Sequence, residues 1–182
     1  MSTDDPEVKE VARIRDGAHP DNPIDKQGGD GDQCQLFGVT GEQHFARTFG
    51  LPLDKRALPA GDGCADFTIL FEIAFGRRER IVTIDVKAAQ SAIYLFIKEP
   101  DIARCADILV LCALDGPKPK KDEPPPTRTP RLIGWETKSM MQLMPVADFG
   151  YGRNFYRAAA ELRPISQLAN ILATRKAPWV TK

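Results

Sequence analysis

Four polar side chains in this sequence have the types and spacing of a small chemical site. Asp85 and Lys87 lie two residues apart near the end of an expected strand, and Asp66 opens the strand before it. Glu42 lies upstream, in an expected helix. Residues two apart on a strand point to the same face, so we expect Asp85 and Lys87 to be neighbours, with Val86 turned into the core.

The two expected strands form an antiparallel hairpin, in which Asp66 can lie beside Asp85. Two carboxylates suit Mg²⁺, which binds one or two carboxylates and keeps several waters. Such an ion can polarise a phosphodiester and lower the pKa of a bound water. Lys87 can orient that water or stabilise the charge that develops on phosphorus. The residues therefore indicate a magnesium site, in which Mn²⁺ can substitute.

The positions of these side chains depend on an alternation of helices and strands. The first long helix is expected to begin near Thr40, which can cap it, and to end at Gly50 and Pro52. The other expected elements are strands at 67–75, 80–86, 92–97, 106–114 and 131–136 and helices at 6–15, 139–143 and 163–174. This pattern predicts a single α/β domain with a mixed β-sheet of about four to five strands, flanked by α-helices.

Composition divides the chain into three regions. Residues 1–37 are expected to form an acidic polar N-terminal arm, since residues 1–33 hold nine acids and four bases. Residues 38–148 form the α/β core, with a Pro/Lys-rich loop at 116–130. Residues 149–182 form a basic segment packed on that core. Such charge asymmetry suggests a region that faces a polyanion, and a solvated surface is the alternative.

The order of the acidic residues and the lysine resembles the core of the PD-(D/E)xK nuclease superfamily. The similarity covers about residues 38–115 and rests on Glu42, on Gly63-x-x-Asp66 and on Asp85-Val86-Lys87. The resemblance implies a restriction-endonuclease-like α-β-β-β-α-β unit with a Mg²⁺-dependent phosphodiesterase site. It also implies a deoxyribonuclease whose substrate is DNA, with a homodimer as one arrangement for cutting two strands.

The resemblance gives each matching residue a role. Asp66 and Asp85 match the two metal-binding acids, and Lys87 matches the lysine that positions the nucleophile or stabilises the transition state. Glu42 matches a helix glutamate that assists through a water or a second ion. Val86 would lend its main-chain carbonyl to the metal.

The sequence departs from the family pattern at two positions. Ala65 stands where proline is usual, and Asp85 stands where glutamate is more frequent. Gln90, three residues after the lysine, is close to a position where some branches keep a glutamine. Asp62 is the rival of Asp66 as the first acid. We favour Asp66 because it adjoins the strand, whereas an aspartate between two glycines is typical of a solvated turn.

Basic residues near the end of the chain are candidates for holding a phosphate backbone. They are Lys118, Lys120 and Lys121 in the Pro/Lys-rich loop and Arg153 and Arg157 in the C-terminal segment. Aromatic residues surround the two arginines. They can stack on bases, or they can pin the segment onto the core.

Composition excludes several classes of protein. The 182 residues carry 25 basic and 25 acidic side chains, which excludes a histone-like or ribosomal-tail protein. Four cysteines without a C-x-x-C pair and two histidines lack the spacing of a structural zinc site. No apolar run approaches the roughly 18–20 residues of a membrane span, and the polar start is unlike a signal peptide. We expect a soluble cytoplasmic protein with no membrane contact.

Two alternatives to a nuclease stay open at this point. One is a non-catalytic module on the same fold that binds nucleic acid or protein. The other is a partner-binding protein unrelated to nucleic acid, in which the acidic arm is an interaction tail.

Overall fold

The computed structural model describes residues 2–17, 31–53, 65–73, 78–90, 92–117, 127–150 and 152–174. Four candidate site residues lie outside these ranges: Asp62, Lys118, Lys120 and Lys121. The helices are α1 (Pro6–Gly17), α2 (Gly31–Phe49), α3 (Lys138–Met141), α4 (Ile165–Ala173) and the 3-10 turns η2 (Glu99–Asp101) and η3 (Ala159–Glu161). The strands are β1 (Phe67–Ile73), β2 (Arg78–Ala89), β3 (Tyr94–Lys98), β4 (Ile108–Asp115), β5 (Thr129–Thr137), β6 (Val146–Asp148) and β7 (Arg153–Ala158). A bilayer-crossing helix, which must be long and apolar, is not found in the described ranges.

A four-stranded mixed sheet forms the centre of the molecule, in the order β1-β2-β4-β5. β1 and β2 form the expected antiparallel hairpin, with Phe67 opposite Ile84. β2 runs parallel to β4, and β4 runs antiparallel to β5. The prediction of a mixed α/β fold is therefore confirmed.

β3 lies in a second sheet, of three strands in the order β3-β7-β6. The strand expected at 92–97 is thus present, but its partner is the distant β7, with Tyr94 opposite Ala158. Apolar patterning identifies a strand and not its neighbour, because strand pairing depends on contacts far apart in the sequence.

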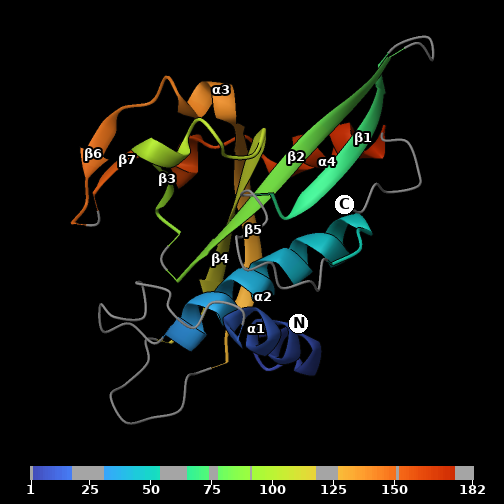
Figure 1. Cartoon of the computed structure of the whole chain (residues 1–182), viewed down its shortest axis with the longest axis vertical. Coiled ribbons are helices and arrows are strands. Elements are labelled where there is room, and N and C mark those ends of the chain that lie inside the picture. Colours follow the sequence, from blue (N-terminus) through green and yellow to red (C-terminus); the bar gives the residue numbers. More distant parts are fainter. Residues whose placement is uncertain are drawn as a thin grey trace.

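Each face of the central sheet has its own apolar core. On one face α2 and α4 contribute Phe45, Leu168 and Leu172 to a cluster with the sheet residues Ile84 and Val86. On the other face Leu95 and Ile97 of β3 pack with Leu109 and Leu111 of β4 and with Met141 of α3. Figure 1 shows α2, in cyan, lying across the sheet, with α1 beyond it.

β4 has the burial expected of a strand covered on both sides. Every residue from Ile108 to Leu114 is buried. Cys112 on this strand and Cys105 just before it are buried free thiols. Burial raises the pKa of the Cys112 thiol to about 12.

The first long helix begins earlier than predicted. α2 starts at Gly31, and Thr40 lies inside it, where its hydroxyl donates to the Leu36 carbonyl at 2.6 Å. The sequence missed this because α1 supports that part of α2, with Val8 and Val11 buried in one cluster with Val39. The end of the helix is as predicted, since Gly50 has φ of +62°.

Candidate active site

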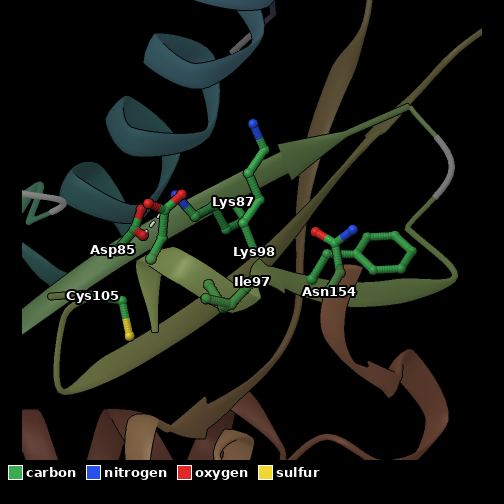
Figure 2. Close-up of a pocket in the computed structure, with 8 residues that line it drawn as sticks. Asp85, Lys87, Ile97, Lys98, Cys105 and Asn154 are labelled. Carbon is green, nitrogen blue, oxygen red and sulfur yellow. Dashed lines mark ion pairs between the residues drawn. The ribbon is translucent and has the colours of Figure 1, made fainter. Parts of the chain in front are cut away.

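The D-x-K tripeptide on β2 has the geometry expected from its spacing. The Lys87 Nζ and Asp85 Oδ2 atoms are 2.7 Å apart, and Figure 2 shows the two side chains pointing toward one another. Asp85 is only 4% exposed, whereas the Lys87 side chain is 44% exposed. Val86 is turned to the other face of the sheet, into the cluster that contains Phe45.

Asp66 lies against this tripeptide, as the hairpin predicted. Its backbone N–H donates to the Ile84 carbonyl at 2.8 Å. Its carboxylate Oδ2 accepts a hydrogen bond from the Val86 N–H at 2.6 Å. The first acid is thereby fixed beside the second acid and the lysine.

Glu42 reaches the same region from α2. This helix packs closely on β2 because Gly41 has no side chain: a Cβ at that position would lie 2.9 Å from the Ala88 Cβ. Glu42 is 6% exposed, and its Oε1 lies 2.8 Å from Nη1 of Arg15. Arg15 belongs to α1, 27 residues away in the sequence, and no spacing rule could have identified it as a partner.

The electrostatics of Asp66 link it to both of the other acids. Removal from water raises the pKa of the Asp66 carboxyl well above its usual range, and the negative charges of Glu42 and Asp85 raise it further. The Val86 N–H and the Lys87 ammonium oppose this shift without cancelling it. The negative charge of Asp66 is therefore disfavoured at this strand end.

The donor chemistry of this site fits a hard divalent cation, since Mg²⁺ prefers carboxylate oxygens. The coordination geometry is not assembled: within the described ranges no three His, Cys, Asp or Glu side chains are grouped so as to hold a metal ion. Instead the three acids contact Lys87, the Val86 N–H and Arg15. The residues fit a metal in ligand type and in charge, and binding would require these carboxylates to exchange partners.

A pocket of about 260 Å³ opens beside Lys87, between the two sheets. Its walls come from β2, β3, β7 and the segment before β4, and they are Asp85, Lys87, Phe96, Ile97, Lys98, Asp101, Cys105 and Asn154. Figure 2 shows Lys98 and Asn154 arriving from different elements at this pocket. Lys98 and Asn154 were not identified from the sequence, because strands of two sheets bring them to the site.

The remaining candidate residues differ in their exposure and in their partners. Gln90 is exposed in the bend after β2. Arg153 is exposed on β7, and its Nε lies 2.9 Å from Oε2 of Glu99. Arg157 points inward and pairs with the fully buried Glu136, a partner that the sequence did not indicate. Arg157 is thus a partly buried ion-pair residue, and its contact with a phosphate backbone stays a prediction.

Comparison of the chain with protein-family models, curated proteins and solved structures gives no match.

Proposed function

We propose that this protein is a metal-dependent nuclease that hydrolyses DNA phosphodiester bonds and has a restriction-endonuclease-like core. The observation that carries the proposal is the grouping of Asp66, Asp85 and Glu42 at one strand end, with Lys87 beside them. A buried acid whose pKa is raised by burial and by neighbouring negative charge, as that of Asp66 is, is typical of functional sites. The match of this grouping to the PD-(D/E)xK order supports the assignment.

Each residue has a role in this proposal. Asp66 and Asp85 hold Mg²⁺ or Mn²⁺ together with the Val86 carbonyl, and Glu42 supplies a third carboxylate nearby. The ion, when bound, lowers the pKa of a water and polarises the phosphodiester. Lys87, which is half exposed, orients the attacking water or stabilises the negative charge on phosphorus.

The surface around the site offers groups that could hold DNA. Lys98 and Arg153 are exposed on β3 and β7. They would contact backbone phosphates together with the lysines of the Pro/Lys-rich loop. A homodimer would place two such sites on the two strands of a duplex.

The test is cleavage of supercoiled, linear and single-stranded DNA by purified protein in Mg²⁺, Mn²⁺ or EDTA. Lys87→Ala and Asp85→Asn should each reduce metal-dependent cleavage by at least about 100-fold, because each removes charge stabilisation from the reacting centre. Asp115→Asn is the matched control, since Asp115 is an exposed strand aspartate with its own basic partner, Arg131 at 2.8 Å.

The cleavage by wild type and by the three variants decides whether the activity belongs to this site. Cleavage that needs the metal, is lost in both site variants and survives in Asp115→Asn supports the nuclease. Equal cleavage by all the variants would assign the activity to a contaminant and overturn the proposal.

A non-catalytic nucleic-acid-binding module is the second candidate. It is favoured by the contacts that the three acids already make and by the lack of an assembled metal group in the described ranges. DNA affinity that falls with salt, with no cleavage in Mg²⁺ or Mn²⁺, would select this function.

A further inference from the structure

The second sheet carries a group of aromatic side chains on its outer face, away from the central sheet. On β7, Phe155 is partly buried in the apolar core that the two sheets share, so the next residue, Tyr156, lies on the opposite face. Tyr156 is directly opposite Phe96 of β3, and Tyr94 is two residues before Phe96. With Phe149, which follows β6, these three residues form what we call the aromatic face. Phe155 therefore holds the segment on the core, whereas Tyr156 belongs to the aromatic face.

The rings of the aromatic face contact one another, and two of them are open to solvent. The Phe149 ring centroid lies 4.8 Å from that of Phe96 and 5.2 Å from that of Tyr156, in edge-to-face arrangements. Phe96 and Phe149 are each 38% exposed. Neighbouring apolar side chains that stay exposed are typical of interaction sites, whereas single ones are common on any surface. The mutual contacts hold the rings in position, so a flat ligand meets a preformed surface.

The aromatic face adjoins the pocket beside Lys87. Phe96 belongs to both, since it contacts Phe149 and also lines the pocket together with Asp85 and Lys87. Lys98, two residues farther along β3, is exposed and lines the same pocket. A ligand that lies on the rings can therefore extend to the charged residues of the D-x-K tripeptide.

The chemistry of this surface fits a nucleic acid strand with unpaired bases. Every base has a flat face that can stack on an aromatic ring, and pairing and stacking in a duplex hide that face. Lys98 and Arg153 are exposed on β3 and β7, and such side chains contact phosphates. Asp85 and Asp101 also line the pocket. Stacking, and not net charge, must therefore supply the preference for this ligand.

We propose that the aromatic face binds unpaired bases of single-stranded DNA and places the strand at the pocket beside Lys87. The bases stack on the two exposed rings, Phe96 and Phe149. This inference deepens the proposed function, on which the choice of DNA rests. It assigns a strand with unpaired bases, and not an intact duplex, as the substrate class of the site.

The experiment measures binding of fluorescently labelled DNA to the full chain by anisotropy, in EDTA so that no metal-dependent cleavage occurs. The probes are an oligothymidylate strand, an abasic strand of the same length and a blunt duplex. The abasic strand keeps the phosphate charge and lacks the bases. Wild type should bind oligothymidylate more tightly than the abasic strand by about 5-fold or more, the contribution of one stacked base.

Variants of the exposed rings test where the bases bind. Phe96→Leu and Phe149→Leu keep an apolar side chain and remove the flat ring, so each should weaken oligothymidylate binding by about 5-fold or more. Neither should change the affinity for the abasic strand or the duplex. Phe96→Tyr keeps the ring and should bind as wild type does. Ile81→Ala is the matched control, because Ile81 is a 57% exposed apolar residue on β2, outside the aromatic face.

The outcomes distinguish this inference from the proposed function. Equal affinity of wild type for oligothymidylate and the abasic strand, or wild-type affinity in both leucine variants, would overturn the inference, while cleavage that depends on metal and on Lys87 would keep the nuclease. Ring-dependent binding without cleavage in Mg²⁺ or Mn²⁺ would support the aromatic face and overturn the nuclease. No binding and no cleavage of any DNA would overturn both.

A second copy of this chain is the competing occupant of the aromatic face. Analytical ultracentrifugation of wild type and Phe96→Leu detects it. A wild-type dimer that becomes a monomer in Phe96→Leu, with no change in DNA affinity, would assign the face to contact between copies and overturn the inference.

Discussion

Buried carboxylates lie at two places on or beside the central sheet, and positively charged side chains neutralise them differently at the two places. Asp85 of β2 and Glu136 of β5 are both in register with Leu109 of β4, so they share one face of the sheet. Glu136 is fully buried and has two arginines, Arg157 and Arg163, the latter at 3.1 Å. It also accepts the Thr137 N–H at 2.8 Å.

At the acidic site of Glu42, Asp66 and Asp85, acidic side chains lie near one another as well as near cations. Glu42 pairs with Arg15 and Asp85 pairs with Lys87, whereas burial and the negative charges of these two acids raise the pKa of Asp66. An acid with more than one cationic partner stabilises the fold that positions those partners. The ionised form of Asp66 is held at a cost in stability, and this cost makes the acidic site a candidate binding site.

The largest loss of stability should come from removing the negative charge of Glu136. Glu136→Gln removes the charge that Arg157 and Arg163 face, and losing one member of a buried ion pair typically costs about 3–5 kcal/mol. Urea unfolding monitored by circular dichroism measures this loss. Asp115→Asn, at an exposed ion pair, should change the free energy of unfolding by less than about 1 kcal/mol. A Glu136→Gln effect as small as that of the control would contradict the comparison.

A smaller effect should follow from moving α2 away from the acidic site. Gly41→Ala places a Cβ 2.9 Å from Ala88, and overpacking of this kind costs about 1–3 kcal/mol. Gly38→Ala on the same helix is the matched control, because its Cβ would have only the Glu42 Oε1 atom near it, at 3.9 Å. Gly38→Ala should stabilise the protein by up to about 1 kcal/mol through helix propensity. Equal thermal unfolding curves for the two variants would show that α2 is not closely packed at Gly41.

The most gradual effect should appear in the pH dependence of stability. Because the pKa of Asp66 is raised in the folded state, its ionisation destabilises the fold as pH rises from about 4 through that higher value. Asp66→Asn lacks this ionisation and can still accept the Val86 N–H. Its stability relative to wild type should therefore increase with pH, by at most about 1.4 kcal/mol per pH unit.

Urea unfolding of both proteins between pH 4 and pH 8, without metal, tests this prediction. If the difference in the free energy of unfolding between Asp66→Asn and wild type stays constant with pH, the pKa of Asp66 is not raised in the folded state. Addition of Mg²⁺ at pH 8 should reduce the difference in the free energy of unfolding between the two proteins. An ion that binds only the folded wild type stabilises the wild type.

Local pattern predicted most of the elements and the centre of the site. Alternation and spacing identified the hairpin, the Asp85–Lys87 pair and the strand that became β4, because these features depend on residues near one another in the chain. The start of α2 was misplaced, since Leu36 and Val39 of this helix are supported by packing with α1. The inward position of Arg157 was also missed, because its partner Glu136 comes from β5.

The sequence by itself determined that two acids and a lysine meet at one strand end. A strand period of two places Asp85 and Lys87 on one face, and an antiparallel hairpin brings Asp66 within reach of them. Only the tertiary structure decided how their charge is balanced. Arg15 reaches Glu42 across 27 residues, and β3 joins β7 in a second sheet that walls the pocket. Such contacts arise from packing between distant segments, for which the local pattern holds no signal.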